Sequence, residues 1–87
     1  MDLKTFNRMS LDEQLKLAIH SKDPSVLDII ARSNNDAAQI FAARNKHTSS
    51  ESLDLIALTT KSKTVVDSLL GNINLLPSTR QMLSKAC

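Results

Sequence analysis

The chain has 87 residues, of which 41% are hydrophobic and 23% are charged, and its formal net charge is +2. This length fits a single domain spanning residues 1–87, and the composition is that of a globular protein, which excludes wholesale disorder. A net charge this small does not by itself indicate a nucleic-acid partner. One glycine and two prolines leave little material for hairpin turns, so we expect an all-α chain.

The cysteine content and the hydropathy pattern bear on the compartment. Cys87 is the single cysteine, so no intramolecular disulfide can form and a reducing compartment is favoured, with Cys87 as a free, exposed thiol. No apolar run approaches the length of about 18 residues that spans a bilayer. The first ten residues lack the basic start and apolar stretch of a signal peptide. We therefore expect a cytoplasmic protein without a membrane span.

Helix-capping residues divide the first part of the chain. Asp2 is placed to cap a short helix that carries Leu3, Phe6 and Met9. Ser10 and Glu13 have the spacing of a capping box, which predicts a helix over residues 11–20. Its predicted buried residues are Leu11, Leu15, Ala18 and Ile19.

The next two helices are also marked by their caps. Asp23 is an N-cap followed by Pro24 at the first helical position, where the missing N–H costs nothing, and this helix should reach about residue 32. The polar run Asn34-Asn35-Asp36 then caps a helix that ends near Arg44.

Three further helices complete the expected set. Thr48 with Glu51 forms a second capping box, with Ser49 as the alternative N-cap, and this helix should end at residues 59–60. Ser62 caps the following helix, Gly71 closes it as a left-handed C-cap, and Pro77 opens the last helix. The total is six or seven helices, each too short to be stable without its neighbours.

An internal repeat relates these helices. With N-caps placed at Asp23, Ser49 and Leu76, successive units are 26 and 27 residues apart, and the helices that end each unit close at Asn45 and Asn72. Equivalent positions are Leu27, Leu53 and Arg80; Ile29, Leu55 and Met82; Ile30, Ile56 and Leu83; and Ala31, Ala57 and Ser84. Each unit is a pair of short helices. This pattern predicts a small right-handed, solenoid-like helical-repeat domain.

Residues 21–87 resemble the leucine-rich repeat variant proteins and, more loosely, short HEAT-like arrays. The resemblance lies in the Asn45 and Asn72 helix ends, the short links after them, and the Leu-x-x-Ile-Ala core of residues 27–31 and 53–57. It implies that some second helices adopt 3₁₀ geometry. The sequence departs from the family in lacking the usual Val-Arg pair, and it lacks the cysteine cluster that binds an iron–sulfur centre in one such protein, so no cofactor is expected.

The residue types needed for catalysis are sparse. His20 and His47 are the only imidazoles, and each falls at a predicted helix end or link, where a solvated or capping histidine is expected. His47 has Ser49, Ser50 and Asp54 near it in sequence, but a catalytic triad also requires an oxyanion site and a geometry assembled across the fold. Two histidines and one cysteine do not make a closed zinc site in one chain. We therefore expect neither an enzyme nor a bound metal.

Basic residues form the one candidate binding site. The candidate partner-binding residues are Arg44, Lys46, His47, Lys61 and Lys63, with Arg32 beside them. In a stack of repeats the first three would lie at one link and the two lysines at the opposite link. Such a basic ridge would bind an acidic protein surface or a phosphate backbone. Alternatively, cations near helix C-termini favour the helix dipole and maintain solubility.

These features predict a small, non-enzymatic protein–protein interaction module that acts stoichiometrically as an adaptor, inhibitor or regulator. The size is that of virus- or plasmid-encoded regulators. One alternative is a small DNA-binding regulator, whose helix–turn–helix would lie in residues 53–70. The scarcity of aromatic residues argues against binding of single strands. Another is a self-associating structural protein, a weak homo-oligomer formed through Leu75, Leu76, Met82 and Leu83 at the C-terminal end.

Overall fold

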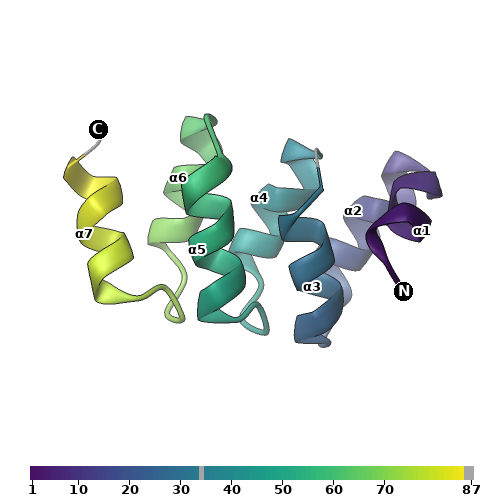
Figure 1. The fold of residues 1–87 in the computed structure, drawn as a ribbon, viewed down its shortest axis with the longest axis horizontal. Coiled ribbons are helices and arrows are strands. Elements are labelled where there is room, and N and C mark those ends of the chain that lie inside the picture. The colour runs from purple at the N-terminus through teal and green to yellow at the C-terminus, as the bar shows by residue number, and fades with distance from the viewer. Residues whose placement is uncertain (34, 86–87) are drawn as a thin grey trace.

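Seven α-helices and no strands make up residues 1–33 and 35–85, the part of the chain that the computed structural model describes (Figure 1). The helices are α1 (Leu3–Arg8), α2 (Leu11–His20), α3 (Pro24–Ala31), α4 (Asp36–Arg44), α5 (Ser50–Thr59), α6 (Lys63–Leu70) and α7 (Pro77–Lys85). The all-α prediction is confirmed. The expectations for Asn34 as part of a capping run and for Cys87 as an exposed thiol fall outside the described residues.

Local capping explains where these helices begin. The backbone N–H of Thr5 donates to Asp2 Oδ1 at 2.8 Å, and this hydrogen bond holds the pKa of the Asp2 carboxyl below its ordinary value. The predicted cap at Ser10 accepts from the backbone N–H of Glu13 at 3.2 Å. The remaining predicted caps, Asp23, Asn35 and Ser62, each accept a backbone N–H from the first turn of their helix.

Two predicted caps are wrong, and the geometry of the links explains both. Ser49, not Thr48, caps α5, because the Thr48 side chain is fully buried and its hydroxyl donates to the Ala42 carbonyl at 2.6 Å. Gly71 has φ −84° and ψ −5°, which is right-handed rather than left-handed backbone. The N–H groups of Gly71 and Asn72 donate to carbonyls three residues back, so this helix closes without a left-handed residue.

The second helix of each pair is α-helical rather than 3₁₀, contrary to what the family resemblance implied. Helices α2, α4 and α6 have 10, 9 and 8 residues. Runs of 3₁₀ helix longer than three or four residues are uncommon because the geometry of their hydrogen bonds is poorer. These lengths therefore favour the α form.

The helices form two layers (Figure 1). In one layer α1, α3, α5 and α7 pack each against the next, and in the other α4 packs between α2 and α6. The molecule measures 36 × 22 × 17 Å along its principal axes. Its core lies between the layers, and the predicted core residues Leu27, Ile30, Leu53 and Ile56 are all fully buried there.

Helix α2 faces the core differently from the prediction. Ala18 is buried as expected, but Leu11 and Ile19 are exposed by 70% and 47%, while Gln14 is buried. The Gln14 amide donates to the carbonyls of Phe6 and Met9 and accepts from Asn35, which directs this side chain inward. Ile19 follows Ala18 by one residue and so points about 100° away from the core-facing side.

Side-chain hydrogen bonds recur about one sequence repeat apart. The Asn45 amide donates to the carbonyls of Ala18 at 3.1 Å and Ser21 at 2.8 Å, and the Asn72 amide donates to those of Ala43 at 2.7 Å and Asn45 at 3.1 Å. Each link between helix pairs is thus tied to the preceding one.

A second recurring bond joins α3 to α5 and α5 to α7. The hydroxyl of Ser52 donates to Asp28 Oδ1 at 3.0 Å, and that of Thr79 donates to Asp54 Oδ1 at 2.5 Å. Both carboxylates stand at the same distance from the cap of their helix, five residues after Asp23 and Ser49. The two hydrogen bonds therefore join residues that stand at the same positions relative to their helix starts.

The Arg80 guanidinium makes hydrogen bonds like those of the Asn45 and Asn72 amides. Its guanidinium donates to the carbonyls of Leu70 and Asn72, which stand 27 residues after Ala43 and Asn45, the carbonyls that accept from the Asn72 amide. Arg80 thus donates to carbonyls that stand at the same sequence offset as those that accept from the Asn72 amide.

Candidate functional site

The structure divides the five candidate partner-binding residues between two edges of the molecule. Helices α4 and α6 run in the same direction (Figure 1). The C-terminal end of α4, which carries Arg44, therefore lies at the opposite edge from the N-terminal end of α6, which carries Lys63. Lys46 and His47 lie in the link after α4, and Lys61 lies in the link before α6.

The residues at the first edge are engaged in structural contacts. Arg44 Nε donates to Ser68 Oγ at 3.2 Å, and the two side chains border a shallow hollow of about 300 Å³ that also contains Asp67. The backbone carbonyl of Lys46 accepts from the Asn74 amide, and the backbone N–H of His47 donates to Asn45 Oδ1. Arg44 thus shares this hollow with a carboxylate, whereas Lys46 and His47 are held through their backbone.

The second edge borders a larger groove. Its volume is about 460 Å³ and it lies where the link after α3 approaches the link after α5. The lining residues are Ala31, Arg32, Ser33, Asp36, Gln39, Leu55, Thr59, Thr60 and Lys61. The fold thus brings together Arg32 and Lys61, which are 29 residues apart in the sequence.

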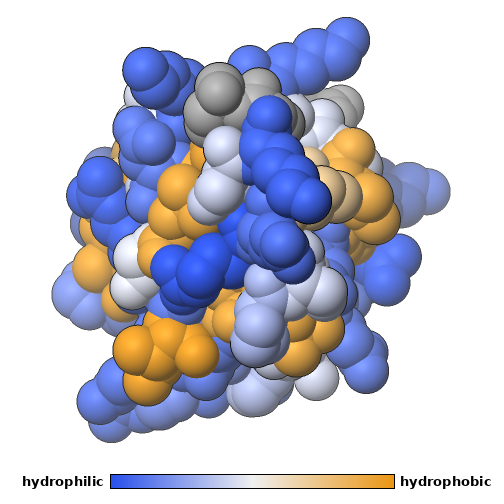
Figure 2. All heavy atoms as spheres, turned by 90° about the vertical axis from the view of Figure 1, so that its left-hand side faces the viewer, coloured by the Kyte–Doolittle hydropathy of each residue, from blue (hydrophilic) through white to orange (hydrophobic). Residues whose placement is uncertain are grey.

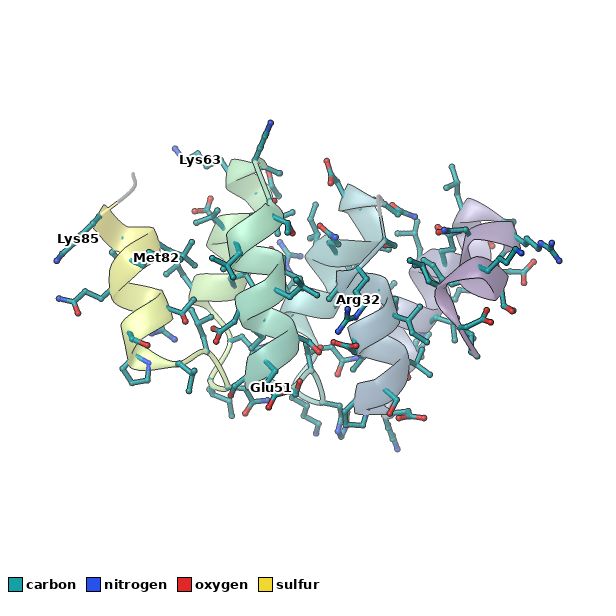
Figure 3. The ribbon with its side chains drawn as sticks, viewed as in Figure 1. Arg32, Glu51, Lys63, Met82 and Lys85 are labelled. Carbon is teal, nitrogen blue, oxygen red and sulfur yellow. The ribbon has the colours of Figure 1, made fainter. Side chains whose placement is uncertain are left out.

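Hydrogen bonds hold one wall of the groove in place, and the cationic side chain at this wall remains exposed. The buried Gln39 amide donates to the carbonyls of Ala31 at 3.1 Å and Ser33 at 2.8 Å, which holds the end of α3 against α4. Arg32 Nε pairs with Asp28 Oδ2 at 2.9 Å, yet the Arg32 side chain remains 59% exposed. Figure 3 shows this side chain on the face that α3 and α5 share.

An apolar stripe crosses the same face. Ile29, Leu55 and Met82 occupy equivalent positions of α3, α5 and α7. Ile29 and Leu55 are partly buried and Met82 is 43% exposed. Leu58, one turn beyond Leu55 on α5, is 73% exposed. Large apolar side chains at the surface therefore extend along the outer side of this layer.

Sequence reasoning identified the cations of this site but missed its apolar part. Leu58 stands nine residues after the Ser49 cap. Arg32 likewise stands nine residues after Asp23, and Lys85 stands nine residues after Leu76. A comparison of equivalent positions would have shown that these three side chains share one line across the layer. Figure 3 places Lys85 and Lys63 at the edge where α7 ends and α6 begins.

The end of the molecule formed by α7 is less apolar than the sequence indicated. Figure 2 views this end and shows hydrophobic patches separated by hydrophilic side chains. Leu75 and Leu83 are each only 5% exposed, whereas Leu76 and Met82 are exposed by 41% and 43%. Two of the four predicted side chains are thus used inside the fold, one in the link before α7 and one on α7, which packs against α5 and α6.

The residues near His47 each have other partners. The hydroxyl of Ser50 donates to the Asn74 carbonyl, Ser49 bonds to Ser52, and Asp54 accepts from Thr79. In residues 1–33 and 35–85, no hydrogen bond joins these groups to the His47 side chain, and no group of three or more His, Cys, Asp or Glu could hold a metal ion.

Comparison with protein families, curated proteins and solved structures found no match to this chain. Among the described residues, none of the helices is both long and apolar enough to cross a bilayer.

Proposed function

We propose that this protein is a non-enzymatic helical-repeat module that binds another protein. In this proposal it acts stoichiometrically in the cytoplasm as an adaptor, inhibitor or regulator, and weak self-association through the α7 end accompanies that role. The recurring bonds of Asn45 and Asn72, and those of Asp28 and Asp54, support the repeat architecture because equivalent residues make equivalent contacts.

The exposed apolar stripe on α3, α5 and α7 is the observation that carries the binding function. Single exposed apolar side chains are ordinary, but Leu58 stands one turn beyond Leu55, whose partly buried side chain lines a groove, and Met82 occupies the equivalent position of the neighbouring helix α7. Apolar surface gathered around a concave site and rimmed by polar residues is typical of protein interaction sites. Replacement of this surface should therefore abolish partner binding.

A capture experiment tests the location and the function together. We expect Leu58→Asp combined with Met82→Asp to lose the proteins that the wild-type chain retains from lysate, because a buried carboxylate would disrupt an apolar contact. Leu11→Asp is the matched control, since Leu11 is 70% exposed but lies on α2 in the other layer. If the double variant still captures the partner and the Leu11→Asp control does not, the partner binds at α2 and this proposal is contradicted.

DNA binding is the second candidate function, and the nearness of Lys61 to Lys63 at the start of α6 is the observation that favours it. Of the candidate residues, only Lys61 and Lys63 share this edge, and phosphate contacts from these two lysines alone imply a log–log salt slope of about −1.8 on duplex DNA. We expect no gel shift of random duplex at micromolar protein and about 150 mM salt. A clear shift that disappears on replacing Lys61 and Lys63 with Glu would establish the DNA-binding function instead.

A further inference from the structure

We propose that the outer face of α3, α5 and α7 recognises a partner segment in which apolar side chains stand beside carboxylates. We call this surface the odd-helix face and define it by Ile29, Leu55, Leu58 and Met82 together with Arg32, Lys61, Lys63 and Lys85. The inference rests on the proposed protein-binding function and adds the chemistry of the bound segment.

The apolar half of the odd-helix face sets the spacing of the segment. Ile29, Leu55 and Met82 lie on three neighbouring helices of one layer. Packed helices stand about 8–10 Å apart. A segment crossing them must therefore present an apolar side chain about every three residues if extended, or about every five to seven residues if helical. Leu55 belongs both to this stripe and to the lining of the groove, so the segment passes the groove where it crosses α5.

The charged half sets the sign of the partner. Arg32, Lys61 and Lys85 are exposed at or just after the C-terminal ends of α3, α5 and α7, and the exposed Lys63 begins α6 at the same edge. Against these four cations stand Asp36, which lines the groove, and Asp28, which pairs with Arg32 Nε. Arg32 uses only its Nε in that ion pair, and its Nη groups make no other hydrogen bond within the described residues. An anionic group is therefore the complementary ligand at this edge.

The two halves together distinguish a peptide from a nucleic acid. A phosphate backbone would satisfy the cations but would leave Leu55, Leu58 and Met82 against a charged ligand. Glu51 lies at the opposite end of α5 from the cations (Figure 3), so the two ends of the face differ in charge and orient the segment. An acidic, apolar peptide segment satisfies both halves.

Selection from a random peptide library displayed on phage tests this chemistry with the intact chain. We expect peptides enriched on the wild-type protein to combine Leu, Ile or Phe with Asp or Glu. Arg32→Glu combined with Lys61→Glu should lower the affinity of these peptides about tenfold or more, since it reverses the charge at the groove. Lys16→Glu is the matched control, because Lys16 is exposed on α2 in the other layer.

Nuclear magnetic resonance maps where an enriched peptide binds. Titration into labelled protein should shift the backbone amides of Leu55, Thr59 and Lys61 and leave those of Ile19 and His20 unchanged. Circular dichroism of each variant confirms that its helices are retained. The neutral pair Arg32→Gln and Lys61→Gln should give an intermediate loss of affinity, which a general disturbance of the fold would not produce.

Several results would overturn the inference. Enriched peptides without acidic residues, equal affinity for the wild-type and charge-reversed proteins, or no enrichment at all would each contradict it. Sedimentation with anionic phospholipid vesicles that is lost on charge reversal would assign the face to a lipid surface instead. One result would separate the two proposals. If a partner from lysate is lost with Leu58→Asp and Met82→Asp but retained by the charge-reversed protein, the protein-binding function is supported and the recognition of carboxylates is contradicted.

Discussion

Replacing Leu53 with alanine should lower the free energy of unfolding by about 2–5 kcal/mol. Leu53 is fully buried in α5, which packs against α3, α4, α6 and α7, so the change leaves a cavity that few neighbours can close. Small domains have a total stability of about 5–15 kcal/mol, so this loss removes a substantial part of it. Urea denaturation followed by far-ultraviolet circular dichroism measures the effect.

Leu58→Ala is the matched control for this change. Leu58 is on the same helix and has the same side chain, but it is 73% exposed. We expect its replacement to alter the free energy of unfolding by no more than about 0.5 kcal/mol. Equal losses for the two variants would contradict the placement of the core between the two layers.

Replacing Asn72 with alanine should lower the free energy of unfolding by about 3 kcal/mol. The Asn72 side chain donates to the carbonyls of Ala43 at 2.7 Å and Asn45 at 3.1 Å and accepts from the Asn74 N–H at 2.8 Å. Loss of one partner of a buried hydrogen bond costs about 1–3 kcal/mol when the other is left unsatisfied. Thermal and urea unfolding would both report the loss.

Two further variants sharpen this test. Asn7→Ala removes the same kind of side chain from an exposed position of α1 and should have little effect. Asn72→Asp keeps the shape but replaces the donating amide with oxygen, which would face two carbonyl oxygens and should destabilise the fold further. If Asn72→Ala and Asn7→Ala had the same free energy of unfolding, the hydrogen bonds of the Asn72 side chain would not be what stabilises the contact between the links.

The sequence predicts the helices of this protein well because their signals are local. A cap such as Ser10 or Asn35 acts on an N–H three residues away, so its role can be inferred from the order of residues alone. The positions of Leu27 and Leu53 in the core follow from periodicity within one helix and from the repeat between helices. The cations of the candidate site could likewise be listed, since residue type determines their charge.

Contacts between one helix and another helix or link decided the rest. Gln14 turned α2 because it reaches the carbonyls of Phe6 and Met9, and no pattern within residues 11–20 contains that information. Arg80 acquired its role from the carbonyls of Leu70 and Asn72, which the fold presents to it.

The candidate site shows the same division between local and tertiary information. The sequence supplied Arg32 and Lys61 as charges, but only the packing of α3 beside α5 placed them around one groove with Leu55 between them. The repeat pattern already placed Arg44 and Lys63 at opposite links, and the parallel course of α4 and α6 agrees with that prediction. Local hydrogen bonding and side-chain periodicity thus determine where each helix lies along the chain, whereas the side that each helix presents depends on partners that only tertiary packing brings within reach.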